Sequence, residues 1–216
     1  MSVPGQQPSS SDMTQNDCFR VLTGRNQRRS LAVRSDMTIW TQPLPADEFL
    51  RPLDVILLEH NRQLTISEWL LEHVDHQQLE PLEENATALL EFLTEDLLLH
   101  HKDEEEDLFP MLRCRCEPED GIDTILVELN RDHAMEDFLV RDIAVDLRKI
   151  IEGKKPEATA RFFHSLYIFA EGQQRHVSWE NKTVLPLAHK RLTSQNLGDL
   201  GWNMAARRGI DYPGSS

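Results

Sequence analysis

The chain has 216 residues, and 37 Asp and Glu against 23 Lys and Arg give it a formal net charge of −14. A chain of this length buries a sizeable core, so it needs neither disulfides nor a metal merely to fold. The acidic balance argues against a nucleic-acid surface and against binding to anionic lipid. No stretch approaches the ~18 consecutive apolar residues of a membrane span, and the N-terminus lacks the apolar core of a secretory signal. We therefore expect a cytoplasmic protein.

The N-terminal part of the chain differs in composition from the rest. It is rich in Ser, Gln, Asn, Arg and Thr and shows no apolar period, so we expect residues 1–45 to be disordered. Met13 or Met37 could each begin the chain without touching the periodic part. The cysteine spacing fits neither a zinc knuckle nor a redox CxxC motif. We expect free thiols at Cys18, Cys114 and Cys116.

Four long segments with helical periodicity follow, and helix-breaking residues separate them. They run over about 50–74, 81–112, 121–151 and 158–192. Nothing alternates like a strand, so the sequence predicts an all-α, up-down antiparallel four-helix bundle. A shorter helix of weak amphipathicity is expected at about 197–208. We therefore divide the chain into a disordered segment over 1–45, a bundle over 46–192, and a C-terminal short helix and tail over 193–216.

Histidines interrupt the apolar stripes of these helices. The stripe of the first helix includes Ile56, Leu57 and Leu64, and His60 lies among them at helical spacing. His133 lies in the same way on the stripe of the third helix. Both imidazoles are therefore expected to point into the bundle.

Two further histidines each precede a glutamate by four residues. His100 and Glu104 form the pair on the second helix, and His176 and Glu180 form the pair on the fourth. Residues at this spacing share one helix face, so both members of a pair reach the same point in the core. Each glutamate is followed six residues later by a proline, within LFP in one case and VLP in the other. The repeated form makes a chance match improbable.

The helix lengths place these residues at one level of the bundle. At the helical rise per residue, His60 lies ~24 Å from the end of the first helix, and His100 lies ~27 Å from the start of the second helix, which carries it. The corresponding distances for His133 and His176 are ~27 and ~28 Å. Two buried carboxylates without cations would be very costly, and a metal removes that difficulty. We predict a metal site formed by His60, His100, Glu104, His133, His176 and Glu180.

Other interpretations of single residues remain open. A lone histidine on an apolar stripe is more often a hydrogen-bonded core residue than a ligand, and four in one layer reverse that expectation. His101 with Glu105 is an alternative register, which matches the proline spacing less well than His100 with Glu104. Asp137 could add a ligand, although an exposed or outer role suits it better. We interpret the rest of the acidic run 103–107 as a solvated helix face. Surface or packing roles are expected for His73, His76, His164 and His189.

These motifs resemble the hemerythrin-like, HHE cation-binding domain. The resemblance covers about residues 48–192 and is carried by His60 and by the segments HHKDEEEDLFPML, DHAMED and RHVSWENKTVLPLA. The ending NMAARRG is also similar to the tail of bacterial members. The resemblance implies a hemerythrin-like bundle with a non-haem di-iron centre bridged by two carboxylates. Its implied ligands are the same six residues that the helix periodicity selects.

The ligand set indicates a subtype within that family. Oxygen-carrying hemerythrins use five histidines and two carboxylates, whereas four histidines and two glutamates resemble bacterial proteins that repair iron centres under nitric oxide stress. Those repair proteins also have a cysteine-bearing N-terminal domain, and here only Cys18 stands in the N-terminal segment. The resemblance implies two iron ions with an oxo or hydroxo bridge, and manganese or zinc are the alternatives.

Three classes of function follow from such a centre. Four imidazoles, two bridging carboxylates and one oxygen bridge leave positions on two octahedral irons open for O2, NO or peroxide. Binding or sensing of O2, NO or iron is favoured over a di-iron enzyme (a peroxidase, an NO reductase or an iron donor in repair), because no acid or base outside the ligand set is evident. A structural bundle with zinc or no metal ranks third. Gly172, with Leu97 and Phe169, predicts a small dry pocket beside the metals. The sequence leaves the protein partner unknown and fits a monomer or a dimer.

Overall fold

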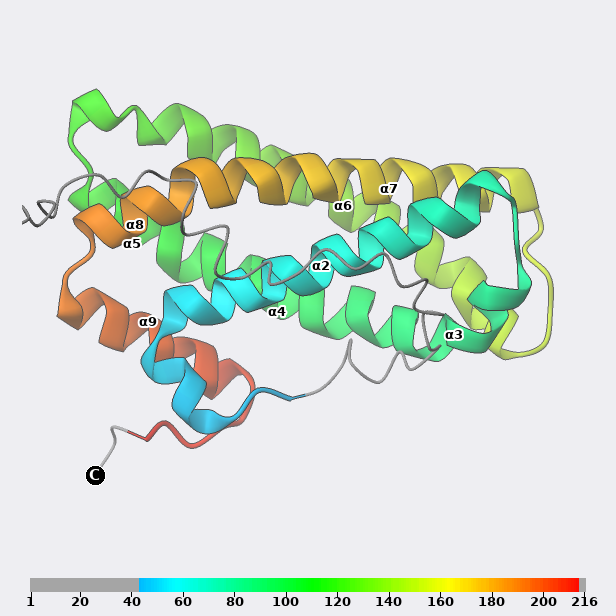
Figure 1. Ribbon diagram of the computed structural model, residues 1–216, viewed down its shortest axis with the longest axis horizontal. Helices are drawn as coiled ribbons and strands as arrows, with labels where there is room; N and C mark the ends of the chain where they lie inside the picture. Colours follow the sequence, from blue (N-terminus) through cyan, green and yellow to red (C-terminus); the bar gives the residue numbers. More distant parts are fainter. Residues whose placement is uncertain (1–42, 214–216) are drawn as a thin grey trace, which may run out of the picture. The chain divides into compact units, whose positions relative to one another are not determined.

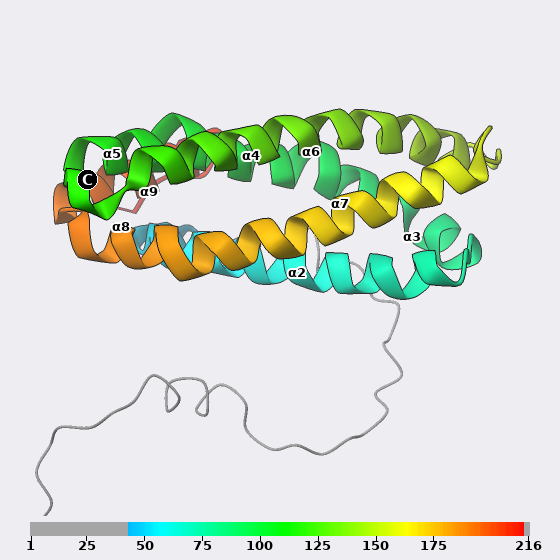
Figure 2. The ribbon, with the colours of Figure 1, turned by 90° about the horizontal axis from the view of Figure 1, so that it is seen from above.

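The computed structural model describes residues 43–213, and these form a bundle of four long helical stretches that run up and down (Figure 1). The view from above in Figure 2 shows α6 beside α7 and α2 below them. The first stretch is α2 (Pro52–Asp75), and the third is α6 (Ile122–Ile151). The second comprises α3 (Glu80–Glu91), α4 (Leu97–Lys102) and α5 (Phe109–Arg115), and the fourth comprises α7 (Thr159–Trp179) and α8 (Leu185–Arg191). No strand occurs in this part of the chain, so the predicted all-α bundle is confirmed. The disorder expected for the N-terminal segment concerns residues that, up to 42, lie outside the described range, as does Cys18.

Local sequence signals account for where the helices begin and end. Proline stands in the first turn of both α2 and α3, where its missing N–H costs no helical hydrogen bond. Between α5 and α6 lies a short 3-10 turn (Pro118–Asp120), and Gly121 follows it in the left-handed conformation with φ 63°. At the C-terminal end, the side chain of Thr193 caps the last helix of the described residues, α9 (Ser194–Arg207), by accepting a hydrogen bond from the Asn196 N–H.

The second and fourth stretches each contain π-helical turns, which the sequence does not predict. These turns are η3 (Phe92–Asp96), η4 (Asp103–Leu108) and η6 (Glu180–Val184). In η4 the Phe109 N–H donates to the Glu104 carbonyl, and in η6 the Leu185 N–H donates to the Glu180 carbonyl. The turns η4 and η6 each come just before a proline of the repeated motif, whose ring has no N–H and clashes with the carbonyl four residues back. The two prolines therefore explain why the helix widens at both glutamates.

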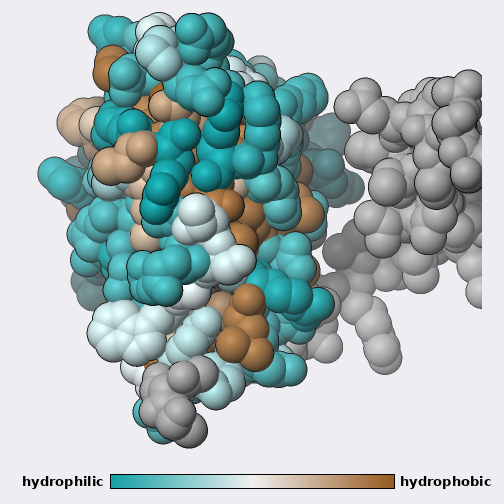
Figure 3. All heavy atoms as spheres, turned by 90° about the vertical axis from the view of Figure 1, so that its left-hand side faces the viewer, coloured by the Kyte–Doolittle hydropathy of each residue, from teal (hydrophilic) through white to brown (hydrophobic). Residues whose placement is uncertain are grey.

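The apolar core forms two clusters along the bundle. One packs α2 and α3 against α6 and α7, and the other gathers side chains from the end where α5, α8 and α9 lie. Figure 3 shows that end, where hydrophilic residues surround smaller hydrophobic areas. The expected stripe of the first helix is partly wrong, because Ile56 is buried whereas Leu57 is 42% exposed. No helix within residues 43–213 is long and apolar enough to span a membrane.

The C-terminal helix α9 packs on the 3-10 helix η2 (Ala46–Leu50) through a glycine. A Cβ atom added at Gly201 would lie 2.1 Å from the backbone oxygen of Phe49, so no side chain fits there without moving the helix. Gly198, in the same helix, has open space around the equivalent position. The close approach therefore fixes how α9 lies against the bundle.

Replacing Gly201 by Ala is expected to lower the free energy of unfolding by about 2 kcal/mol, because the added methyl group forces the backbone to move and overpacking of this kind costs about that much. The melting temperature should fall by about 5 °C. Gly198→Ala is the matched control, and it should stabilise the protein by about 0.5 kcal/mol through helix propensity alone. Thermal and urea unfolding of both variants measure the difference. Equal stability of the two variants would show that α9 does not pack on Phe49 in this way.

Candidate metal centre

All six side chains predicted to bind metal converge at one level of the bundle and are almost completely buried. The Nε2 atoms of His60 and His176 each lie 3.2 Å from Glu180 Oε2. Glu104 faces the same space, with Oε2 3.5 Å from His100 Nε2 and 3.4 Å from His133 Nε2. Side chains that are distant in sequence, from all four helical stretches, thus meet within a small volume.

The donor atoms form two overlapping groups, each able to hold one metal ion. The first group contains His60 and His100, and the second contains His133 and His176. Both groups include Glu104 and Glu180, and within each group the donor atoms lie within 4.8 Å of one another. Two ions held by these groups would share both carboxylates.

Unpartnered buried atoms test whether this donor set fits a metal. Both carboxylate oxygens of Glu104 and of Glu180 are buried without a hydrogen-bond partner, as are the Nε2 atoms of His60 and His100. The Nε2 atoms of His133 and His176 face each other at 3.0 Å. Buried polar atoms are rarely left unpaired, and a cation between these atoms would satisfy them together. The residues therefore fit a metal pair.

Without metal, the cluster holds its charges by pairing glutamates with imidazoles. Burial opposes the charged form of His60, but Glu104 and Glu180 outweigh it and raise its pKa to about 10. Burial likewise opposes protonation of His176, whereas Glu180 raises its pKa to about 9. Burial and the neighbouring Glu104 would raise the pKa of Glu180, yet His176 and His60 bring it down to about 2. Protons thus occupy the place that metal ions would take.

The Nδ1 atom of each histidine faces an acceptor outside the centre. His60 donates to Asn181 Oδ1 at 2.6 Å, His100 to Glu59 at 3.1 Å, and His133 to Glu105 at 2.8 Å. His176 Nδ1 has no hydrogen-bond partner, and the nearest carboxylate, that of Asp132, lies 3.7 Å from it. An acceptor at Nδ1 keeps the proton there and leaves the Nε2 lone pair for a metal. The outer partners that the sequence analysis missed are Glu59, Glu105, Asp132 and Asn181, and each is the immediate sequence neighbour of a predicted ligand.

The alternative register does not reach the centre. His101 belongs to neither donor group, and its Nε2 lies 3.3 Å from the carboxylate of Glu136 on α6. Asp137 is 45% exposed and lies 3.7 Å from His101 Nδ1, so it too stands outside both groups. The buried amide of Gln173 donates to Glu136 at 2.6 Å. A second buried His–Glu pair therefore lies beside the centre, and no spacing motif in the sequence pointed to Glu136 or Gln173.

The acidic run 103–107 is not simply a solvated face, as we had expected. Asp103 is completely buried, and Asp107 is 8% exposed. Arg207 of α9 contacts Asp103 at 2.8 Å and Asp107 at 2.5 Å, and Arg208 contacts Asp103 at 2.7 Å. These ion pairs let two carboxylates be buried in the turn that carries Glu104. The arginines at the end of the C-terminal helix thus neutralise carboxylates that lie next to the centre.

The remaining histidines and the cysteines lie apart from the donor groups. His73 is half-buried and hydrogen-bonds the Trp69 carbonyl, and Cys114 and Cys116 are free thiols. The residues expected at the surface or in packing roles, and found outside both groups, are His73, His76, His164 and His189.

A comparison with protein families identifies this arrangement of histidines and glutamates. The model of the hemerythrin HHE cation binding domain matches residues 51–188, and this range contains all six converging side chains. The chain belongs to the hemerythrin HHE cation-binding family. The helix α9, which ends at Arg207, and the following Arg208 lie beyond the matched range of this hemerythrin-like domain.

A curated relative extends further than the family match. An uncharacterized protein of Haemophilus influenzae is 25% identical over 171 residues, which cover 79% of this chain and 92% of that protein. No solved structure matches the chain significantly. Membership of this family supports a cation-binding helical bundle.

Proposed function

We propose that the protein is a non-haem di-iron protein that binds or senses O2, NO or iron at a carboxylate-bridged centre. The observation that carries the proposal is the sharing of Glu104 and Glu180 by two buried donor groups. The proposed ligands are His60, His100, Glu104, His133, His176 and Glu180.

The donor chemistry supports iron. Imidazole and carboxylate together suit iron or manganese better than copper, and the family description names cation binding. When bound, two irons supply a change between ferrous and ferric states and open positions for a small ligand. The protein's own part is to orient the imidazoles from outside and to exclude water. Apolar residues beside the layer serve the second purpose, such as Leu97, Phe109 and Phe169, each at most 2% exposed.

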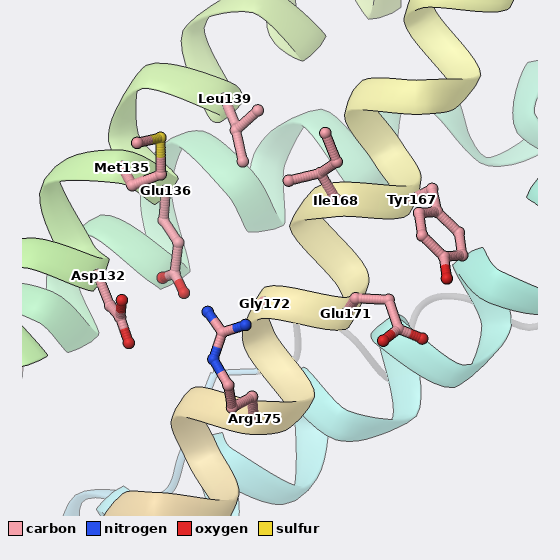
Figure 4. A pocket seen from close by; sticks show the side chains of 9 residues that line it. All are labelled: Asp132, Met135, Glu136, Leu139, Tyr167, Ile168, Glu171, Gly172 and Arg175. Carbon is pink, nitrogen blue, oxygen red and sulfur yellow. The ribbon is translucent and has the colours of Figure 1, made fainter.

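A pocket of about 220 Å³ between α6 and α7 offers a route towards the second donor group. Figure 4 shows Gly172 and Arg175 on one side of the pocket, and Asp132 and Glu136 on the other. Asp132 also supplies the carboxylate nearest to His176 Nδ1. This pocket has charged as well as apolar walls and is lined by none of the six proposed ligands, so it differs from the small dry pocket predicted with Leu97 and Phe169.

Replacing Gly172 by Leu is expected to slow the binding of O2 or azide at least about tenfold, which corresponds to about 1.4 kcal/mol in the barrier. A Cβ atom at Gly172 meets nothing within 4 Å, so the added side chain fills the pocket without distorting α7. Gly198→Leu, at another helical glycine with open space, is the control and should bind at the normal rate. Stopped-flow absorbance measures both. Unchanged kinetics in Gly172→Leu would exclude this route.

A di-iron enzyme is the second candidate, and one observation favours it. Glu136 lines the pocket and lies 3.3 Å from His101 Nε2. Burial lowers the pKa of His101, but Asp137 and Glu136 outweigh burial and raise this pKa to about 10. An acid–base pair outside the ligand set therefore lies beside the pocket, contrary to the expectation from the sequence.

Stopped-flow mixing of the reduced protein with O2, NO and peroxide separates the two candidates. A binding or sensing protein forms one complex per centre and releases O2 or NO when the ligand is removed. An enzyme instead consumes many equivalents per centre, and Glu136→Gln should slow that turnover. Protein that contains zinc or no metal would contradict both candidates and leave a structural bundle.

A further inference from the structure

Four outer side chains form a ring around the centre; three of them hydrogen-bond a ligand histidine, and the fourth, Asp132, faces one at 3.7 Å. Glu59 on α2 reaches His100 on α4, and Glu105 on η4 reaches His133 on α6. Asp132 on α6 then faces His176 on α7, and Asn181 on η6 reaches back to a ligand on α2. Each helical stretch thus supplies its own donor and, one residue away, the outer side chain that faces the donor of the next stretch; Asp132 acts on His176 through its charge alone.

The ring has one neutral member. Glu105 and Asp132, which serve the second donor group, are carboxylates, and the ion pairs of residues 43–213 give neither of them a lysine or arginine partner. Arg175 lies across the pocket from Asp132. In the first group, Arg208 contacts Glu59 at 2.8 Å, and Asn181 carries no charge. The first group therefore receives less negative charge from its outer partners than the second.

The charge of an outer partner changes how strongly an imidazole donates to a metal. A carboxylate at Nδ1 draws the Nδ1 proton towards itself and makes Nε2 more basic, whereas an amide oxygen does so far less. The loss of such a partner typically lowers metal affinity about 10- to 100-fold. Since both groups share the same two glutamates and have two histidines each, the charge of the outer side chains is one feature that distinguishes them.

We propose that Asn181 makes the two metal positions unequal, so that the ion in the His60–His100 position is held about 10- to 100-fold more weakly and leaves first. Asn181 acts through the ring of His60 and is a positioning residue. The inference rests on the proposed metal pair and adds which position is labile. A labile position next to a firmly held one would suit a protein that senses or exchanges iron.

Titration of the metal-free full-length protein with Co²⁺, followed by visible absorbance, tests the proposal. The wild type should take up Co²⁺ in a tight and a weak step, separated about 10- to 100-fold. His60→Ala should abolish the weak step, and His133→Ala should abolish the tight one. Equal steps in the wild type, or loss of the tight step in His60→Ala, would overturn the proposal.

Exchanging the charges of the outer side chains at positions 181 and 105 shows whether their placement, rather than the total charge, sets the order of the two steps. Asn181→Asp alone should bring the two steps together, and Glu105→Gln alone should weaken the tight step. The double variant Asn181→Asp/Glu105→Gln keeps the net charge and should reverse the order, so that His133→Ala now abolishes the weak step. Glu105 is 41% exposed and both changes are nearly isosteric, so the variants should fold, which circular dichroism confirms.

The outcomes also separate this inference from the proposed function. Two steps that keep their order in the double variant would overturn the role of Asn181 while the metal pair stands. A wild type that takes up no Co²⁺ would overturn the metal pair itself, and the inference with it.

Discussion

The double variant Glu104→Gln/Glu180→Gln is expected to keep its helices and to lose both metal ions. Each glutamate belongs to both donor groups, so the two substitutions remove the shared ligands of the whole centre. Loss of an outer partner alone costs about 10- to 100-fold in affinity, and loss of two shared ligands should therefore cost well over 100-fold. Elemental analysis of the purified protein measures the metal content, and circular dichroism measures the helices.

The matched control for this variant is Glu106→Gln. Glu106 lies in the same π-helical turn as Glu104, but its side chain is 57% exposed and contacts Arg207 rather than the centre. It should retain the full metal content. A double variant that still held two ions per chain would show that the ligand assignment is wrong.

The second large effect is a dependence of stability on pH that appears only when metal is removed. In the metal-free protein the pKa of His60 is raised from 6.5 to about 10, and that of His176 to about 9. A raised pKa in the folded state gives stability that is complete below the unfolded value of 6.5 and is lost as the pH rises through 9 to 10. Metal ions displace these protons, so the metal-bound protein should not lose stability in this range.

Thermal melts between pH 6.5 and 10, with and without a chelator, measure this effect. The melting temperature of the metal-free protein should fall on the order of 10 °C across the range, since one unit of pKa shift corresponds to about 1.4 kcal/mol. Calorimetry in two buffers should show proton release on metal binding at pH 7. His164→Gln, at an exposed histidine, should leave both results unchanged. A metal-free protein with a flat profile would show that these imidazoles are not protonated inside the bundle.

The sequence predicts the bundle and the convergence of the six side chains because both depend on helical periodicity. Helix ranges and the level of each histidine follow from local spacing and from the short loops. The same reasoning fails for Leu57, because the width of a buried face depends on the neighbouring helices. The π-helical turns η4 and η6 were also missed, although the prolines that cause them were part of the repeated motif.

Contacts between distant segments could not be predicted. The acidic run looked solvated because the cations that let Asp103 and Asp107 be buried, Arg207 and Arg208, come from a helix about a hundred residues later. The outer acceptors stand next to the ligands in the sequence, but neighbouring residues point in different directions on a helix. Only the packed bundle shows that each acceptor reaches the histidine of another helix.

Metal identity and stoichiometry in protein purified from its native host test the central claim most directly. Elemental analysis should find two irons per chain, in agreement with two donor groups that share both glutamates. A single ion per chain, zinc in place of iron, or no metal would contradict a di-iron centre.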